Sequence, residues 1–473
     1  MNENILKKDF QLPKCDKKAL GHFVLSFLLP NIVFVIVCFF LSAARPLINI
    51  DYIFPCLLLA FNHKFIRIIG VVLYIAVILS DAFTIITQFF QFLDLAALRD
   101  FIPFVFDAPK EYIFLYSLLI VLLIVLPLSA WILNKKTQKT YAIIFSIIAF
   151  IMFYLFGYMG DFKYSHQSND SFITNNFFIH SQFYSIKDSM NFMFGKALLK
   201  PATLSEFYPN GEYQRASVNI QQPYNKKILL IVAESLGSLK NESAQQEVFR
   251  KISEQKDLYE FLTIDEVHID GATVQGEIRE LCNLLLHNGH DTRHFNAEDF
   301  SVCLPQILGK QGYHTTAFHA AASPMYHRKS LYPKLGFQKT MFNEQMQDKK
   351  RCHSFKGTCD SEIFPLVAKE FANNDKALVY WLTLTSHYPY SEKDIFNHRF
   401  NCGQFNIETN SICRNIQMQT QFMDLLAELS TKPEMKGVEV LIVGDHMPPA
   451  FENDVYQTIK LHRSAFLHFK IKE

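Results

Sequence analysis

The chain has 473 residues, with 46 Lys and Arg against 45 Asp and Glu and a formal net charge of +1. That length exceeds one ordinary globular domain, so two or more structural units are expected. The near-neutral charge gives no support to a nucleic-acid partner, because such partners are met by strongly basic surfaces.

Apolar residues gather in the first third of the chain and predict a helical membrane domain, 1–160, with five spans. The predicted spans are 21–44, 47–61, 66–90, 112–133 and 141–159, of which the second is short and contains Asp51. Lysines and arginines cluster before the first span, after the second and after the fourth, which predicts a cytoplasmic location for those segments. The odd number of spans then puts the rest of the chain outside the cytoplasm. The first apolar run is too long for a cleavable signal.

Residues 161–226 form a polar, aromatic-rich linker on the far side of the membrane. Within it, 175–195 places phenylalanines among polar residues, a pattern typical of an interfacial helix on the bilayer or of an ordinary packed helix.

Residues 227–473 show the alternation of an α/β domain. Apolar runs predict strands at 228–235, 314–320, 377–385 and 438–446, and helical patterns lie at 273–287 and 415–429. This order predicts a mostly parallel central sheet with helices on both faces. Ligands of such sheets bind beyond the carboxyl ends of the strands.

Six of the nine cysteines lie in this C-terminal half as close neighbours, and an even set fits an oxidising compartment. Several pairings are possible, but the short local loops favour the sequential one. The pairs are Cys282 with Cys303, Cys352 with Cys359, and Cys402 with Cys413.

Two carboxylates and an imidazole stand at the ends of predicted strands. Glu234 ends the apolar run "LIVAES", and Asp445-His446 end the run "VEVLIVGDH". A carboxylate after core aliphatic residues is costly unless it faces a positive charge. Two carboxylates and a neutral imidazole suit a divalent metal such as Zn²⁺ or Mn²⁺.

A hydroxyl at a predicted helix start supplies the candidate nucleophile. Thr273 follows Gly271 in "GATVQGEIRELC", where the first-turn N–H groups and the helix dipole favour an anion. A bound cation can deprotonate such a hydroxyl. Two alternatives remain open: Thr273 is only an N-cap, or Ser235, beside Glu234, is the nucleophile.

These motifs resemble those of the membrane-bound phosphoethanolamine and phosphoglycerol transferases of the alkaline phosphatase superfamily. That group includes the lipid A phosphoethanolamine transferases and the lipoteichoic acid synthases. The resemblance covers nearly the whole chain and implies a sulfatase-like domain after the membrane helices. It assigns the metal to Glu234, Thr273, Asp445 and His446, with Thr273 as the catalytic nucleophile. Zinc is the implied metal, with Mn or Mg as alternatives.

The same resemblance nominates residues that bind the phospho-substrate. The stretch "AFHAAASPMYHRKSLYPKLGF" is similar to a synthase segment and implies His319, Tyr326 and Arg328. The stretch "TLTSHYPYS" is similar to a Ser-His-Pro segment and implies His387. Cys402 and Cys413 resemble a disulfide of the phosphoethanolamine branch.

The resemblance implies an enzyme of the bacterial inner membrane with a periplasmic catalytic domain. It would move phosphoethanolamine from phosphatidylethanolamine to a lipopolysaccharide or other envelope glycan through a phospho-threonine. The Ala-Glu-Ser motif is closer to the synthases, and Met447 stands where many relatives have Gly. A phosphoglycerol transferase using phosphatidylglycerol, or a membrane-bound phosphatase or phosphodiesterase, therefore stays open. A sulfatase proper is disfavoured because no C-x-P-x-R or S-x-P-x-R motif occurs.

Overall fold

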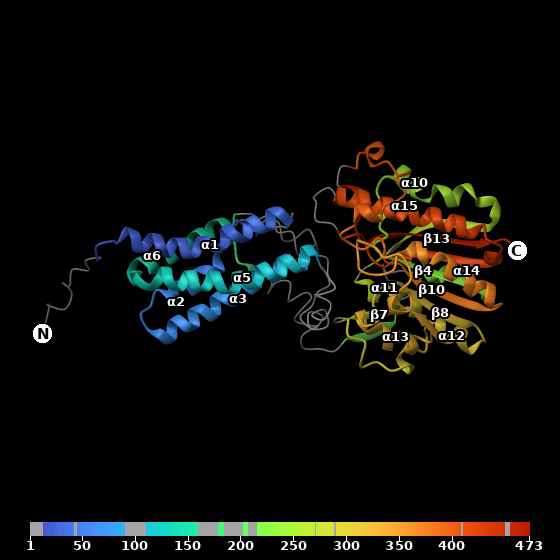
Figure 1. Cartoon of the computed structure of the whole chain (residues 1–473), viewed down its shortest axis with the longest axis horizontal. Helices are drawn as coiled ribbons and strands as arrows, with labels where there is room; N and C mark the ends of the chain where they lie inside the picture. Colours follow the sequence, from blue (N-terminus) through green and yellow to red (C-terminus); the bar gives the residue numbers. More distant parts are fainter. Residues whose placement is uncertain are drawn as a thin grey trace. The chain divides into compact units, whose positions relative to one another are not determined.

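The computed structural model describes residues 13–41, 45–89, 110–158, 178–183, 202–206, 215–269, 271–287, 290–407, 410–449 and 455–473 (Figure 1). The described residues up to 183, Lys110 excepted, belong to one compact unit, and those from 202 onward belong to another. Each unit is described by itself below.

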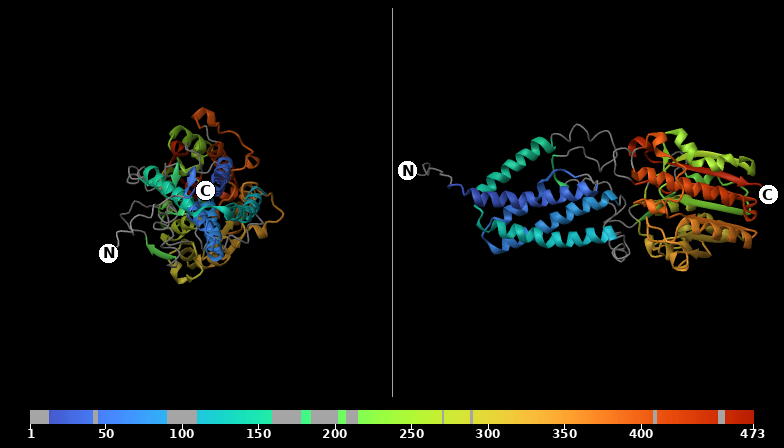
Figure 2. Two further views of the ribbon diagram at one scale, coloured as in Figure 1. Left: turned by 90° about the vertical axis from the view of Figure 1, so that its left-hand side faces the viewer. Right: turned by 45° about the horizontal axis from the view of Figure 1, so that its top comes forward.

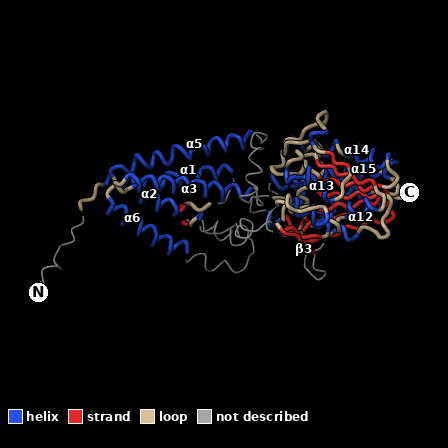
Figure 3. Tube along the Cα trace, turned by 90° about the horizontal axis from the view of Figure 1, so that it is seen from below, coloured by secondary structure: helices blue, strands red, loops and turns tan. Residues whose placement is uncertain are grey.

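The longer elements of the first unit are all helices (Figure 3). Its helices are α1 (Lys17–Leu41), α2 (Ile53–Leu59), α3 (Lys64–Phe89), α5 (Lys110–Leu133) and α6 (Lys139–Met152). Three segments are long and apolar enough to cross a membrane, namely Lys17–Phe40, Lys64–Ile86 and Ile113–Lys136. The other two predicted spans coincide with the shorter apolar helices Ile50–Leu59 and Lys139–Leu155. At about 1.5 Å per residue, the first of these falls well short of a hydrocarbon core about 30 Å thick.

A buried ion pair lies inside the first unit. Arg45 donates from Nε and Nη2 to the Asp81 carboxylate at 2.8 and 2.7 Å. The Tyr52 hydroxyl donates to the same carboxylate at 3.1 Å, and Asn31 Oδ1 accepts from Arg45 Nη2 at 3.0 Å. A charged pair so far from water persists only when its remaining hydrogen-bonding groups are also satisfied.

A short return segment, 178–183, packs on this polar cluster. Strand β2 (Ile179–His180) pairs in parallel with β1 (Ile48–Asn49), and the carboxylate of Asp51 accepts from Ser181 Oγ at 2.6 Å and from the Phe183 N–H at 2.8 Å. This segment is the described part of the predicted interfacial helix, 175–195, and it holds a strand. The remainder of that predicted helix lies outside the described residues.

The second unit is built on a seven-stranded sheet in the order β6-β13-β11-β4-β10-β8-β9. The strands are β6 (Tyr259–His268), β13 (Arg463–Ile471), β11 (Val438–Gly444), β4 (Lys227–Ala233), β10 (Ala377–Leu382), β8 (His314–His319) and β9 (Lys339–Met341). The strands from β11 to β9 are parallel, whereas β13 is antiparallel to both of its neighbours. The sheet is thus mixed and mostly parallel, and its four predicted strands are the central ones.

Both faces of the sheet are covered by helices (Figures 1 and 2). Side chains of β4 alternate between two cores: Leu229 and Ile231 enter one, and Ile228 and Leu230 enter the other. This alternation follows from the two-residue period of a strand. The first core includes residues of α10 (Glu242–Glu254), α14 (Phe364–Asn373) and α15 (Asn410–Ser430). The second includes residues of α11 (Thr273–Cys282), α12 (Leu304–Lys310) and α13 (Arg328–Leu335).

The helix predicted at 273–287 is in fact two elements, a helix followed by a strand. Helix α11 ends at Cys282, because Asn283 adopts the left-handed conformation with φ of 57°. Asn tolerates that conformation better than most residues. The apolar residues that follow form β7 (Leu284–His287), which pairs antiparallel with β3 (Thr203–Glu206).

Smaller elements complete the second unit. Strand β5 (Ser238–Leu239) pairs with β12 (Ile459–Lys460), which follows the short helix α16 (Val455–Thr458). Three disulfides join the cysteines in the sequential order, Cys282–Cys303, Cys352–Cys359 and Cys402–Cys413.

Candidate metal site

The site forms where two neighbouring parallel strands end. Strands β4 and β11 are in register to their last residues, with Ala233 opposite Gly444. Glu234 and Asp445, the next residue on each strand, are therefore brought to the same edge of the sheet. Gly444 allows this close approach, since a Cβ there would lie 2.1 Å from the carbonyl oxygen of Leu236.

The turn after β4 ties these two carboxylates together. Ser235 has a positive φ of 56°, which directs its N–H to Asp445 Oδ1 at 2.8 Å. Its hydroxyl donates to Glu234 Oε1 at 2.9 Å. Ser235 thus contacts both carboxylates, and it donates its hydroxyl proton to Glu234.

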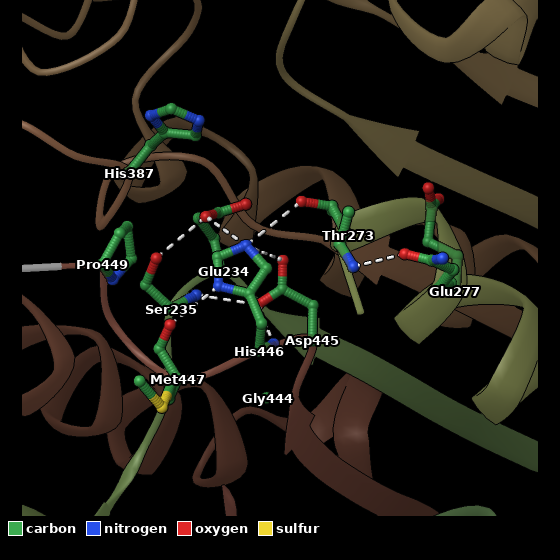
Figure 4. A network of polar contacts seen from close by, with 12 residues as sticks. Glu234, Ser235, Thr273, Glu277, His387, Gly444, Asp445, His446, Met447 and Pro449 are labelled. Carbon is green, nitrogen blue, oxygen red and sulfur yellow. Dashed lines mark hydrogen bonds and ion pairs between the residues drawn. The ribbon is translucent and has the colours of Figure 1, made fainter. Parts of the chain in front are cut away.

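Three predicted ligands and the Thr273 hydroxyl converge at this edge (Figure 4). Ligand atoms of Glu234, Asp445 and His446 all lie within 4.8 Å of one another. Nε2 of His446 is 3.4 Å from Glu234 Oε1, 3.3 Å from Asp445 Oδ2 and 3.4 Å from Thr273 Oγ1. The Oδ2 atom of Asp445 is buried and accepts no hydrogen bond from the described residues. A buried carboxylate oxygen without a donor, facing a second carboxylate and an imidazole, fits a divalent cation.

The charges of Glu234, Asp445 and His446 favour the binding of a cation. Burial raises the pKa of Asp445 to about 7, and the neighbouring charge of Glu234 adds to that effect. For His446, burial opposes protonation, but the charges of Asp445 and Glu234 outweigh it and raise its pKa. Two carboxylates held together in a buried site repel each other, and a cation would remove that cost.

Helix α11 brings Thr273 to the site. Thr273 is the first helical residue and Ala272 is the N-cap, so the structure does not use the threonine as a cap. Gly276 faces the backbone of Asp445, because a Cβ there would lie 2.9 Å from both Cα and the carbonyl oxygen of Asp445. Arg279 donates to the carbonyl oxygens of Gly444 at 2.9 Å and Asp445 at 3.3 Å. These contacts fix the distance between the helix start and the turn that carries Asp445 and His446.

Three of the four predicted substrate-binding residues lie in one network with Glu277, in which Arg328 and His319 are buried and Tyr326 is partly buried. Arg328 donates from Nε and Nη2 to Glu277 Oε2, at 2.9 and 2.8 Å. Its Nη1 lies 3.2 Å from Nε2 of His319, and its Cζ is 4.9 Å from the centre of the Tyr326 ring. The Nε and Nη2 edge of the Arg328 guanidinium is therefore occupied by Glu277.

His387 is held apart from that network. Its Nδ1 is 2.7 Å from the carbonyl oxygen of Tyr388, and its ring is 4.4 Å from that of Phe355. Burial lowers its pKa to about 4, so the imidazole is neutral at physiological pH. In the view of Figure 4, His387 lies on the opposite side of Glu234 from Thr273.

Sequence reasoning missed Gly276, Glu277 and Arg279 as parts of the site. Only the spacing of Glu277 after Thr273 carried a signal, because a charged residue four positions on lies on the same helical face. An amphipathic helix explains the same charges by solvent exposure, yet Glu277 and Arg279 are buried.

The sulfatase family model matches residues 226–467. The chain is also similar in structure to the lipoteichoic acid synthase LtaP from Listeria monocytogenes, at 15% identity over 53% of this chain and 68% of that one, with a TM-score of 0.40. A second similar structure is the periplasmic domain of EcEptC from Escherichia coli in complex with Zn, at 13% identity over 57% and 77%, with a TM-score of 0.37. A third is the Streptococcus pyogenes phosphoglycerol transferase GacH with sn-glycerol-1-phosphate, at 15% identity over 54% and 70%, with a TM-score of 0.37. No curated protein matches the chain.

Proposed function

The chain belongs to the sulfatase family, and we propose that it is a membrane-bound phosphotransferase acting on phospholipid head groups. The observation that carries this proposal is the hydroxyl of Thr273, at a helix start and 3.4 Å from His446 in the carboxylate-imidazole cluster. A nucleophile beside a cation site and a helix N-terminus suits attack on a phosphate. Neither motif required for a sulfatase nucleophile occurs in the sequence.

The reaction has two displacements at phosphorus. In the first, the Thr273 hydroxyl loses its proton and Oγ forms a bond to the head-group phosphorus, the bond to the diacylglycerol oxygen breaks, and that oxygen takes up a proton. In the second, an acceptor hydroxyl loses its proton and attacks the phospho-threonine, the bond from phosphorus to Oγ breaks, and Oγ takes up a proton. Covalent catalysis divides one difficult displacement into two easier ones.

The described residues supply the positioning for these steps. Glu234, Thr273, Asp445 and His446 would hold the cation, for which zinc is the proposed identity and Mn or Mg the alternatives. When bound, the cation stabilises the alkoxide of the threonine and the charge on phosphate oxygens. His319, Tyr326, Arg328 and His387 are the proposed substrate-binding residues.

The preferred donor is phosphatidylethanolamine, and the preferred acceptor is a lipopolysaccharide sugar or other envelope glycan. The three apolar helices would keep the site at its lipid donor, and we propose a transmembrane domain of five helices, 1–160, a periplasmic linker, 161–226, and a periplasmic catalytic domain, 227–473. The location would be the bacterial inner membrane. Phosphatidylglycerol is the alternative donor, and it would give a phosphoglycerol transferase.

Mass spectrometry of the full chain tests the proposal. After incubation with phosphatidylethanolamine or phosphatidylglycerol, we expect a head-group adduct on Thr273 that is lost on adding an acceptor glycan. Thr273→Ala, as the matched control, should carry no adduct. An adduct that decays equally fast in buffer alone would identify a phosphatase or phosphodiesterase instead. Absence of any adduct and of any released diacylglycerol with both lipids would contradict the proposal.

A further inference from the structure

A third carboxylate, that of Glu277, takes no part in the steps above and lies about one helical turn after Thr273 on α11. Glu277 is fully buried. Its oxygens accept four hydrogen bonds, from Arg328 Nε at 2.9 Å, Arg328 Nη2 at 2.8 Å, Tyr332 at 2.6 Å and Tyr380 at 3.2 Å. Such a degree of burial is sustainable for a carboxylate only with a paired cation and satisfied lone pairs.

This carboxylate fixes the position of Arg328. The guanidinium is only 1% exposed, and burial alone would lower its pKa, but the charge of Glu277 outweighs burial and raises it. Because Nε and Nη2 both donate to Glu277 Oε2, this edge of the guanidinium faces Glu277, and Nη1 is directed to His319. Charge-assisted hydrogen bonds from two nitrogens of one guanidinium hold its orientation more firmly than a single bond would.

His319 continues the same network in a defined protonation state. Burial and the charge of Arg328 lower the pKa of His319 well below its usual value, so the imidazole is neutral. Nε2 accepts from Arg328 Nη1 at 3.2 Å, which leaves Nδ1 to donate to the carbonyl oxygen of Leu382 at 3.3 Å. Arg328 is thereby connected through His319, the last residue of β8, to the carbonyl oxygen of Leu382.

Glu277 also shares helix α11 with Thr273. The two residues are four positions apart and lie one above the other on one helical face. We propose that Glu277 is a positioning residue: it holds Arg328 at a fixed place relative to the Thr273 hydroxyl, so that the Nη1 end of the guanidinium can bind a phosphate at that hydroxyl. This inference rests on the proposed function and adds a residue that acts through Arg328.

The test uses the full-length protein in detergent with two separate readouts. The first is release of labelled diacylglycerol from fluorescent phosphatidylethanolamine or phosphatidylglycerol. The second is calorimetric binding of phosphoethanolamine and of sn-glycerol 1-phosphate, which needs no turnover. Glu277→Gln keeps the size of the side chain and removes its charge. We expect it to lower kcat/KM and affinity at least about tenfold, since small displacements of a positioned group have large effects on rate.

The matched control is Glu439→Gln. Glu439 is equally buried and accepts from His468, Gln221 and Asn225. It lies on β11 near the strand's start, away from Asp445. We expect this variant to lose stability but to keep kcat/KM and affinity within about twofold, which separates a general loss of packing from a positioning effect.

Coupling to Arg328 gives the decisive comparison. In an Arg328→Gln background, Glu277→Gln should cause no further loss of affinity or turnover, because the group that it positions is already gone. Equal losses in both backgrounds, or an unchanged affinity in the single variant, would overturn the proposal. If Glu277→Gln does not fold, Glu277→Asp in the same cycle replaces it. A wild type that binds both phosphates but releases no diacylglycerol would overturn the proposed function, and the affinity cycle would still decide the role of Glu277.

Discussion

The hydroxyl oxygen of Thr273 lies 3.4 Å from Nε2 of His446, although 173 positions separate the two residues. The parallel strands β4 and β11 place His446 at the edge of the sheet, and Gly276 lets helix α11 approach the backbone of Asp445, the residue before His446. Arg279 then ties the helix to the carbonyl oxygens of Gly444 and Asp445. The proposed nucleophile therefore depends on a helix-to-turn contact as much as on the metal ligands.

Replacement of Thr273 separates its chemical role from its packing. Thr273→Ala should abolish release of labelled diacylglycerol, because no oxygen remains to attack phosphorus. Thr273→Ser keeps the hydroxyl and should retain a measurable fraction of the rate. Normal turnover by the alanine variant would refute the nucleophile, though it would leave the cation site untouched.

Removal of the metal should lower thermal stability. A cation that binds only the folded protein at about a hundred times its Kd stabilises it by about 2.7 kcal/mol. Chelation followed by zinc titration should therefore raise the midpoint of thermal unfolding in the wild type. Asp445→Asn removes a ligand whose Oδ2 has no hydrogen-bond donor among the described residues. That variant should show no zinc-dependent shift, and a full shift would argue against a cation at this position.

Gly276 offers a steric test of the contact between α11 and Asp445. A methyl group at Gly276 would lie 2.9 Å from Cα of Asp445, whereas one at Gly309 in α12 would lie 3.9 Å from Nε2 of Gln338. Gly276→Ala should cost about 1–3 kcal/mol by overpacking and also reduce turnover. Gly309→Ala should stabilise by up to about 1 kcal/mol through helix propensity and leave turnover unchanged. Chemical unfolding and the diacylglycerol assay check both variants.

The approach of Glu234 to Asp445 was predictable because strand ends in a parallel sheet meet at one edge. Glu234 and Asp445 each follow an uninterrupted apolar run, and nothing more than that topology was needed to bring them together. Glu277 was not predictable in this way. Its partner Arg328 comes from a different helix, and the pairing exists only in three dimensions.

Other misses have equally specific causes. Leu284 and Leu286 continue the apolar pattern of α11, so only the backbone of Asn283 shows that the helix has ended. Strand β6 exposes much of its surface at the edge of the sheet and carries acidic residues, which weakens its apolar pattern. In the first unit, hydropathy alone cannot distinguish a span from the shorter helix Ile50–Leu59.

Substitution of only one partner of the ion pair between Arg45 and Asp81 should strongly destabilise the first unit. Asp81→Ala leaves a guanidinium buried without its partner, which costs about 3–5 kcal/mol. Replacement of both residues, Arg45→Met with Asp81→Leu, should recover most of that loss, because no unpaired charge remains. Thermal unfolding in detergent checks this order. A single variant as stable as the wild type would show that the pair contributes little.

Asp360 should make the stability of the second unit depend on pH. Burial raises its pKa to about 6, against the lowering effect of the hydrogen bonds donated by the N–H groups of Thr385 and Leu384. An unfolded aspartate titrates near pH 4, so the folded state prefers the protonated form between these values. The stability that Asp360 contributes is thus fully present below about pH 4 and is lost as the pH rises to about 6.

The expected size of that loss is about 3 kcal/mol, at about 1.4 kcal/mol for each unit of pKa difference. Asp360→Asn keeps the shape of the side chain and cannot ionise. The difference in unfolding free energy between variant and wild type should therefore change across pH 4–6 and be constant above pH 7. A difference that does not vary with pH would mean that Asp360 titrates normally, because equal pKa values in the folded and unfolded states leave no linkage to stability.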